Sequence, residues 1–73
     1  MPDDIRIGDR VEVHLGSDFW ESEGWFAGVV VRIDPYSQHR RFYWVELDAG
    51  VRAASGGTTR LVSVLHPSRI RKA

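Results

Sequence analysis

Hydrophobic and polar side chains alternate along much of the chain with a period of two, which is typical of a half-buried β-strand. The alternation is clearest over residues 5–15, where apolar side chains occupy odd positions and polar ones occupy most even positions, around a Gly8-Asp9 turn. This pattern predicts a first strand whose apolar face is formed by Ile5, Ile7, Val11, Val13 and Leu15.

Further strands are predicted between clusters of glycine, proline and other turn-forming residues. They cover residues 27–34, 42–48, 60–66 and the short segment 70–71. The small, glycine-rich segment 49–59 is expected to be a flexible loop. No helix of useful length, internal repeat or second domain is predicted. We therefore expect residues 1–73 to form one all-β domain, a small five-stranded barrel.

Side-chain parity predicts which residues of these strands share a face. In the second strand it groups Ala27, Val29, Val31 and Ile33. In the third strand it separates Tyr43, Val45 and Leu47 from Phe42, Trp44 and Glu46. The fourth strand leaves two alternatives open, because its inward face is either Leu61 and Leu65 or Val62 and Val64.

Composition excludes several function classes. Ten basic and ten acidic residues give a formal net charge of zero, which argues against a strongly basic nucleic-acid module. The absence of cysteine excludes disulfides, thiolate nucleophiles and cysteine zinc sites. No apolar run approaches the roughly 20 residues of a membrane span. The first residues lack the features of a signal peptide, so we expect a cytoplasmic protein without a membrane segment.

The order of these features resembles SH3-like barrels, and within them the Tudor/Agenet group. The resemblance spans about residues 7–71 and is carried by the segments 8–13 (GDRVEV), 24–30 (GWFAGVV), 43–48 (YWVELD) and 65–70 (LHPSRI). It implies a five-stranded SH3-like (Tudor-like) barrel.

The resemblance also implies activities that can be compared with this chain residue by residue. Tudor-like domains bind methylated side chains in an aromatic cage. Phe26 matches one cage position, whereas His14 or Leu15, Glu46 and Ala49 fall near the others, so most of the cage is missing. In type II dihydrofolate reductases, which are small oligomeric barrels, the catalytic strand reads Val-Gln-Ile-Tyr. Here residues 62–65 read Val-Ser-Val-Leu, so neither the Gln nor the Tyr is present.

Aromatic rings next to acidic residues form the main candidate binding site. Such rings and carboxylates suit a basic protein or peptide. We therefore expect a non-catalytic binding or adaptor module, with Asp18 adding to its charge complementarity. The expected ligand-binding residues are Phe19, Trp20, Glu21, Glu23, Trp25, Phe26, Phe42 and Trp44.

The alternatives follow from how charge is distributed along the chain. Residues 1–31 hold seven acids and two bases (−5), and residues 32–73 hold three acids and eight bases (+5). If the fold keeps these halves apart, head-to-tail self-assembly into a homo-oligomer becomes a second function class. A nucleic-acid-binding barrel is the third, using bases interleaved with aromatic rings. Its expected residues are His39, Arg40, Arg41, Arg69, Arg71 and Lys72.

Catalytic and metal-binding motifs are not evident. His14, His39 and His66 have no metal-ligand spacing, and no nucleophile elbow accompanies the serines. We expect no catalytic residues, no metal site and no cofactor.

Overall fold

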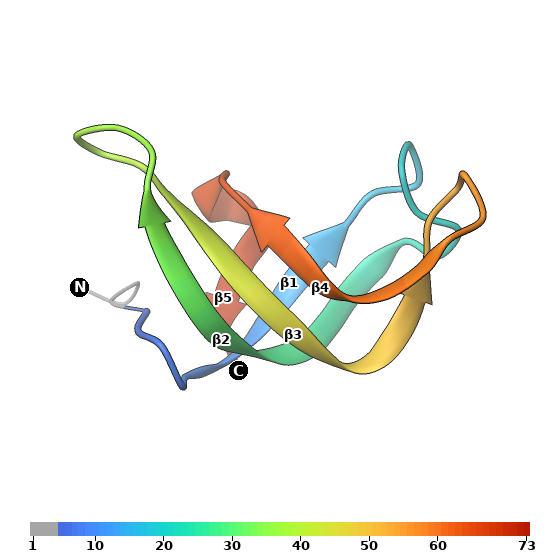
Figure 1. The fold of residues 1–73 in the computed structure, drawn as a ribbon, viewed down its shortest axis with the longest axis horizontal. Coiled ribbons are helices and arrows are strands. Elements are labelled where there is room, and N and C mark those ends of the chain that lie inside the picture. The colour runs from blue at the N-terminus through green and yellow to red at the C-terminus, as the bar shows by residue number, and fades with distance from the viewer. Residues whose placement is uncertain (1–4) are drawn as a thin grey trace.

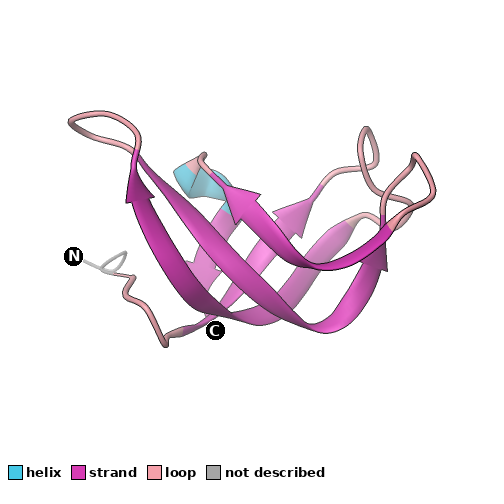
Figure 2. Ribbon diagram, viewed as in Figure 1, coloured by secondary structure: helices cyan, strands magenta, loops and turns pink. Residues whose placement is uncertain are grey.

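A computed structural model describes residues 5–73 and contains five antiparallel strands in one sheet, of order β4-β3-β2-β1-β5. The strands are β1 (Arg10–Leu15), β2 (Gly24–Pro35), β3 (Arg41–Arg52), β4 (Thr58–Val64) and β5 (Ile70–Lys72). A single 3-10 turn, η1 (Pro67–Arg69), precedes β5 (Figure 2). The all-β class is confirmed. Residues 1–4, on which the expectation of no signal peptide rests, lie outside the described residues.

The sheet is curved but open. Figure 1 shows β2 and β3, each of twelve residues, bending so that the sheet forms a trough. β4 and β5 are the two edges, and no ladder joins them among the described residues. β5 has only three residues and pairs with β1 alone. The expected five strands are therefore present, and their sheet is not closed.

The core lines the inner side of the trough. Val11 and Val13 are completely buried, as the alternation in the first strand predicts. In the fourth strand the valine alternative is confirmed, because Val62 and Val64 are buried whereas Leu61 is 48% exposed. The buried apolar side chains are Ile5, Val11, Val13, Leu15, Val30, Val45, Leu47, Val51, Val62, Val64 and Ile70.

Two predictions of burial are wrong. Ile7 is 63% exposed, because it lies in the turn before β1, where strand alternation does not apply. The prediction that Ala27, Val29, Val31 and Ile33 share one face of the second strand is also wrong. The pairing of β2 with β3 shifts between Val30 and Arg32, as in a β-bulge, so the inward parity changes from Val30 to Ile33. Val31 consequently points outward and is 44% exposed.

The loop expected over residues 49–59 is shorter in the structure. β3 continues to Arg52, and buried Val51 pairs with Thr59 of β4 after an irregularity in the ladder. Only the segment 53–57 connects the strands. Val51 explains this result, because burying its side chain holds the glycine-rich segment in the sheet.

Candidate functional site

Ion pairs join the acidic first half of the chain to its basic second half. Asp9 pairs with Lys72 (3.6 Å), Glu12 with Arg71 (2.8 Å) and Glu21 with Arg52 (3.1 Å). Further pairs are Arg10–Asp48 (2.6 Å) and Arg32–Asp34 (2.9 Å). Antiparallel pairing therefore interleaves the two halves and removes much of the segregation seen along the sequence.

The charged side chains that form no ion pair are better candidates for binding a ligand than the paired ones. Among the described residues, the side chains of Arg40, Arg41 and Arg69 form no ion pair or hydrogen bond, and the same holds for the acids Asp18, Glu23 and Glu46. Arg40 lies on the loop between β2 and β3 and Arg41 is the first residue of β3, whereas Asp18 and Glu23 lie on the loop between β1 and β2. Two of the unpaired bases and two of the unpaired acids therefore lie beyond opposite ends of β2.

A groove of about 270 Å³ lies between the β2–β3 loop and the segment leading into η1. We call it the cationic groove. Its lining residues are Gln38, His39, Arg40, Arg41, Tyr43, Leu65 and Pro67. None of the acidic side chains within residues 5–73 lines it, so none of these would repel an anion bound there.

The loop that supplies these bases is held by local contacts. The backbone N–H groups of Tyr36 and Ser37 both donate to the Arg40 carbonyl oxygen, at 3.0 and 3.1 Å. The rings of Tyr36 and Phe42 meet edge to face, with centroids 5.3 Å apart. These contacts close the loop, whose residues 38–40 are exposed.

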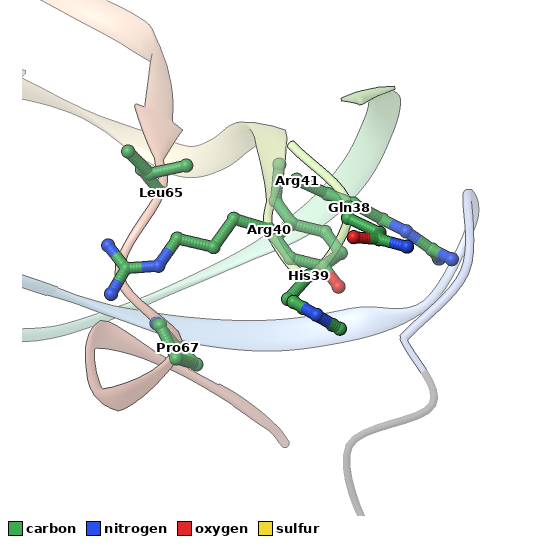
Figure 3. Close-up of a pocket in the computed structure, with 7 residues that line it drawn as sticks. Gln38, His39, Arg40, Arg41, Leu65 and Pro67 are labelled. Carbon is green, nitrogen blue, oxygen red and sulfur yellow. The ribbon is translucent and has the colours of Figure 1, made fainter. Parts of the chain in front are cut away.

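The opposite wall of the cationic groove is apolar. In Figure 3 the Arg40 side chain extends from the loop toward Leu65 and Pro67, whereas Arg41 and Gln38 point the other way. Tyr43 packs against the core with part of its surface exposed. An arginine beside apolar and aromatic side chains can contact both a phosphate or carboxylate and a flat ring.

The predicted nucleic-acid residues are only partly brought together. His39, Arg40 and Arg41 line the cationic groove. Arg69 is on η1, and its Nη1 atom lies 3.5 Å from where a Cβ on Gly16 would be, which places the guanidinium beside the end of β1. Arg71 and Lys72 belong to β5, where both are ion-paired.

The predicted aromatic-acidic surface is divided between several places. Phe26 and Trp20 pack against the core, and Trp20 also bridges to Ala53. Trp25, the neighbour of Phe26 in β2, is on the outer face and covered by Arg71. Glu21 is held by Arg52. These side chains therefore do not form one continuous ligand surface.

Phe42 and Trp44 are both half-buried, at a distance from the first loop. Phe42 packs against Tyr36, whereas the Trp44 indole N–H donates to Asp34 (3.1 Å). Trp44 also lines a second, outer groove of about 360 Å³ with Val31, Arg32 and Leu61.

What remains of the aromatic-acidic surface is the end of the β1–β2 loop. Phe19 is 75% exposed there, on the same loop as the unpaired Asp18 and Glu23. We call these three residues the acidic tip. The Phe19 carbonyl accepts a hydrogen bond from the Ala54 N–H (2.8 Å), and the Glu21 N–H donates to the Arg52 carbonyl (2.9 Å). The loop is thus fastened to the neighbouring β3–β4 connection.

The histidines, serines and acids of residues 5–73 are the candidates for metal-binding or polar clusters. Within residues 5–73, no three His, Asp or Glu side chains lie close enough to share a metal ion. Ser68 Oγ lies 2.7 Å from His66 Nδ1, but the Ser68 backbone N–H also donates to that nitrogen, so this contact caps η1. None of the described residues belongs to a helix long and apolar enough to cross a membrane.

Four residues that line the groove are not among the predicted site residues: Gln38, Tyr43, Leu65 and Pro67. Strand parity predicts Tyr43 on one face with Val45 and Leu47 and offers Leu65 as one alternative for the inward face of the fourth strand. The sequence signal that points to the groove is the segment 38–41, which carries two adjacent arginines with no acid nearby in the sequence.

A scan against protein-family models, a search of curated proteins and a search of solved structures give no match to this chain.

Proposed function

We propose that the protein is a non-catalytic binding module with an open SH3-like barrel fold, and that its cationic groove binds single-stranded nucleic acid. One observation carries the proposal: Arg40 and Arg41 have no acidic partner and line a groove that also contains a tyrosine ring. The meander order of the strands and the 3-10 turn before β5 support the fold assignment.

The unpaired arginines favour a polyanion. A phosphate can bind Arg40 or Arg41 without first breaking an ion pair, whereas Arg32, Arg52 and Arg71 are each engaged by a carboxylate. Contacts to phosphates release condensed counterions, which supplies sequence-independent affinity. The zero net charge means that this affinity comes from one local site rather than from the whole surface.

The rings near the groove favour a single strand over a duplex. Tyr43 lines the groove, and Tyr36 on the adjoining loop is 60% exposed. Unpaired bases can stack on such rings, whereas bases inside a duplex cannot reach them. Arginine beside aromatic rings is a common arrangement on proteins that bind single strands.

The direct test is a fluorescence-anisotropy titration of a labelled short oligonucleotide. We expect R40Q/R41Q to weaken binding by about tenfold and to reduce the slope of log affinity against log salt by about 1.4, since single strands contribute roughly 0.7 per phosphate contact. The control R52Q/K72Q removes the same charge from ion-paired positions and should change affinity by less than about twofold. Wild-type protein that does not bind at low salt, or R40Q/R41Q that binds as tightly as wild type, contradicts the proposal.

A second candidate function concerns the acidic tip, where an exposed ring shares one loop with two unpaired carboxylates. This arrangement supports the recognition of a basic protein or peptide. Titration with an arginine-rich peptide should shift the amides of residues 17–24 in the wild type and not in D18N/E23Q. Shifts that are the same in both proteins exclude this site.

A further inference from the structure

The acidic tip and the cationic groove are separated by the length of β2. The tip is on the loop that precedes β2, whereas the arginines of the groove follow β2, Arg40 on the β2–β3 loop and Arg41 as the first residue of β3. Figure 1 shows these two loops at opposite ends of the trough, whose longest dimension is 35 Å. One copy therefore cannot place its own tip in its own groove.

The two sites are complementary in charge and in apolar character. The tip offers two unpaired carboxylates and an exposed phenyl ring. The groove offers two unpaired arginines, of which Arg40 extends toward the apolar side chains of Leu65 and Pro67 and Arg41 points the other way (Figure 3). Bidentate arginine–carboxylate contacts and burial of the Phe19 ring would both become available on docking.

We propose that the acidic tip of one copy docks in the cationic groove of a second copy, so that the protein associates head to tail. The proposal rests on the proposed function only in using the same groove as an anion acceptor. The occupant is a second copy, because this chain itself carries the basic surface that the tip requires. The hydrogen bonds that hold the tip loop to residues 52–54 order it in advance, which lowers the entropic cost of docking.

The contact is heterologous, so each docked copy leaves one free tip and one free groove. Such contacts produce open chains or rings rather than a closed two-fold dimer. The surfaces are small and charged, so association is expected to be weak, dependent on concentration and sensitive to salt. A nucleic acid in the groove would displace the tip of the neighbouring copy and dissociate the chains.

Charge-swap variants test this docking by sedimentation velocity. Wild type should show an average mass that rises with concentration at low salt and returns to the monomer mass at high salt. D18K/E23K gives a chain with a basic tip and a basic groove, and R40E/R41E gives one with an acidic tip and an acidic groove. Each should remain monomeric alone, and an equimolar mixture of the two should associate.

Two further variants separate docking from general charge attraction. D18K/E23K/R40E/R41E reverses both sites and keeps the formal net charge at zero, so it should associate as wild type does. E46K changes an unpaired acid on β3, away from both loops, and should leave association unchanged. Circular dichroism melts verify that each variant is folded.

The outcomes also distinguish this inference from the proposed function. Wild type that stays monomeric at low salt and high concentration overturns the inference, as does unchanged association in both two-site swaps, which would indicate contact through another surface such as the β4 edge. Oligonucleotide binding is measured in dilute protein, where chains are dissociated. Its failure, together with the expected swap pattern, removes the proposed function and leaves head-to-tail docking in place.

Discussion

The Arg71 guanidinium of β5 stacks on the Trp25 indole of β2, with its Cζ atom 3.8 Å from the ring centroid. Arg71 Nε also donates to Glu12 Oε1 at 2.8 Å, and His14 meets the Trp25 ring edge-on at a centroid distance of 5.3 Å. A cation of the chain itself therefore occupies one face of the tryptophan that the sequence predicts as a ligand contact, and the side chain stays 38% exposed. This cluster ties the short β5 edge strand to the sheet.

Replacing Arg71 by alanine should lower the free energy of unfolding by about 1 kcal/mol, because a partly exposed cation–π contact and an exposed ion pair are lost together. K72A removes a longer exposed ion pair and should cost less. Urea unfolding followed by tryptophan fluorescence measures both values. Equal stability of R71A and wild type would show that the stack contributes nothing to holding β5.

Gly28 allows β2 and β3 to approach closely. A Cβ at this position would lie 2.5 Å from the Glu46 carbonyl oxygen and 2.8 Å from Val45 Cγ1. Because the nearest atom belongs to the backbone, the strand itself must shift, and we expect G28A to cost about 1–3 kcal/mol of stability. G57A, where the new methyl group meets no atom within 4 Å, is the control and should be nearly neutral. Urea unfolding gives the denaturation midpoint of each variant. Similar midpoints for G28A and G57A would argue against the close approach of β2 and β3 at Gly28.

Thr59 caps part of the exposed β4 edge. Its hydroxyl accepts from the Leu61 backbone N–H (3.1 Å) and donates to the Leu61 carbonyl (3.2 Å). T59V removes both bonds, whereas T59S keeps the hydroxyl. We expect the Leu61 amide to exchange with solvent deuterium faster in T59V, by about fivefold if the bonds contribute roughly 1 kcal/mol. Equal exchange rates in T59V and T59S would mean that the hydroxyl does not protect this edge.

Acid should destabilise the fold partly through Asp48. Arg10 donates two hydrogen bonds to this carboxylate (3.0 and 2.6 Å), and they lower the pKa of Asp48. The Arg6 backbone N–H likewise lowers the pKa of Asp9. Since the folded-state pKa lies below the unfolded value, this stability is present above the unfolded pKa and is lost as pH falls through the folded one.

The melting temperature should therefore be steady near neutral pH and fall below about pH 4. D48N should be less stable than wild type at neutral pH and should converge with it in acid. E46Q, at an unpaired acid, should follow the wild-type curve. A constant difference between D48N and wild type across the pH range would show that Asp48 is not the titrating group.

Much of the fold is predictable because strand alternation is a local property. The alternation placed Val11 and Val13 inside and identified the third strand, and both follow from side chains two residues apart. The shift at Val31 and the continuation of β3 through Val51 depend on how neighbouring strands pair. Such pairing is set by contacts between distant residues, so it could not be predicted from a single run of sequence.

The candidate site was less predictable for the same reason. Arg40 and Leu65 are far apart in the sequence and meet only because β4 returns the chain past the β2–β3 loop. Whether an arginine is free also depends on strand register, which places Arg71 opposite Glu12 in the β1–β5 ladder. Composition identifies the number of charges, whereas only the fold shows which of them remain unpaired.

The most direct test of the central claim is an NMR titration of the wild-type protein with a short single-stranded oligonucleotide, following backbone amides. We predict saturable shifts in the amides of residues 38–43, 65 and 66, on the two sides of the cationic groove, and their loss in R40Q/R41Q. Shifts confined to residues 17–26, or no shifts at low salt, would contradict the assignment of the groove as the binding site.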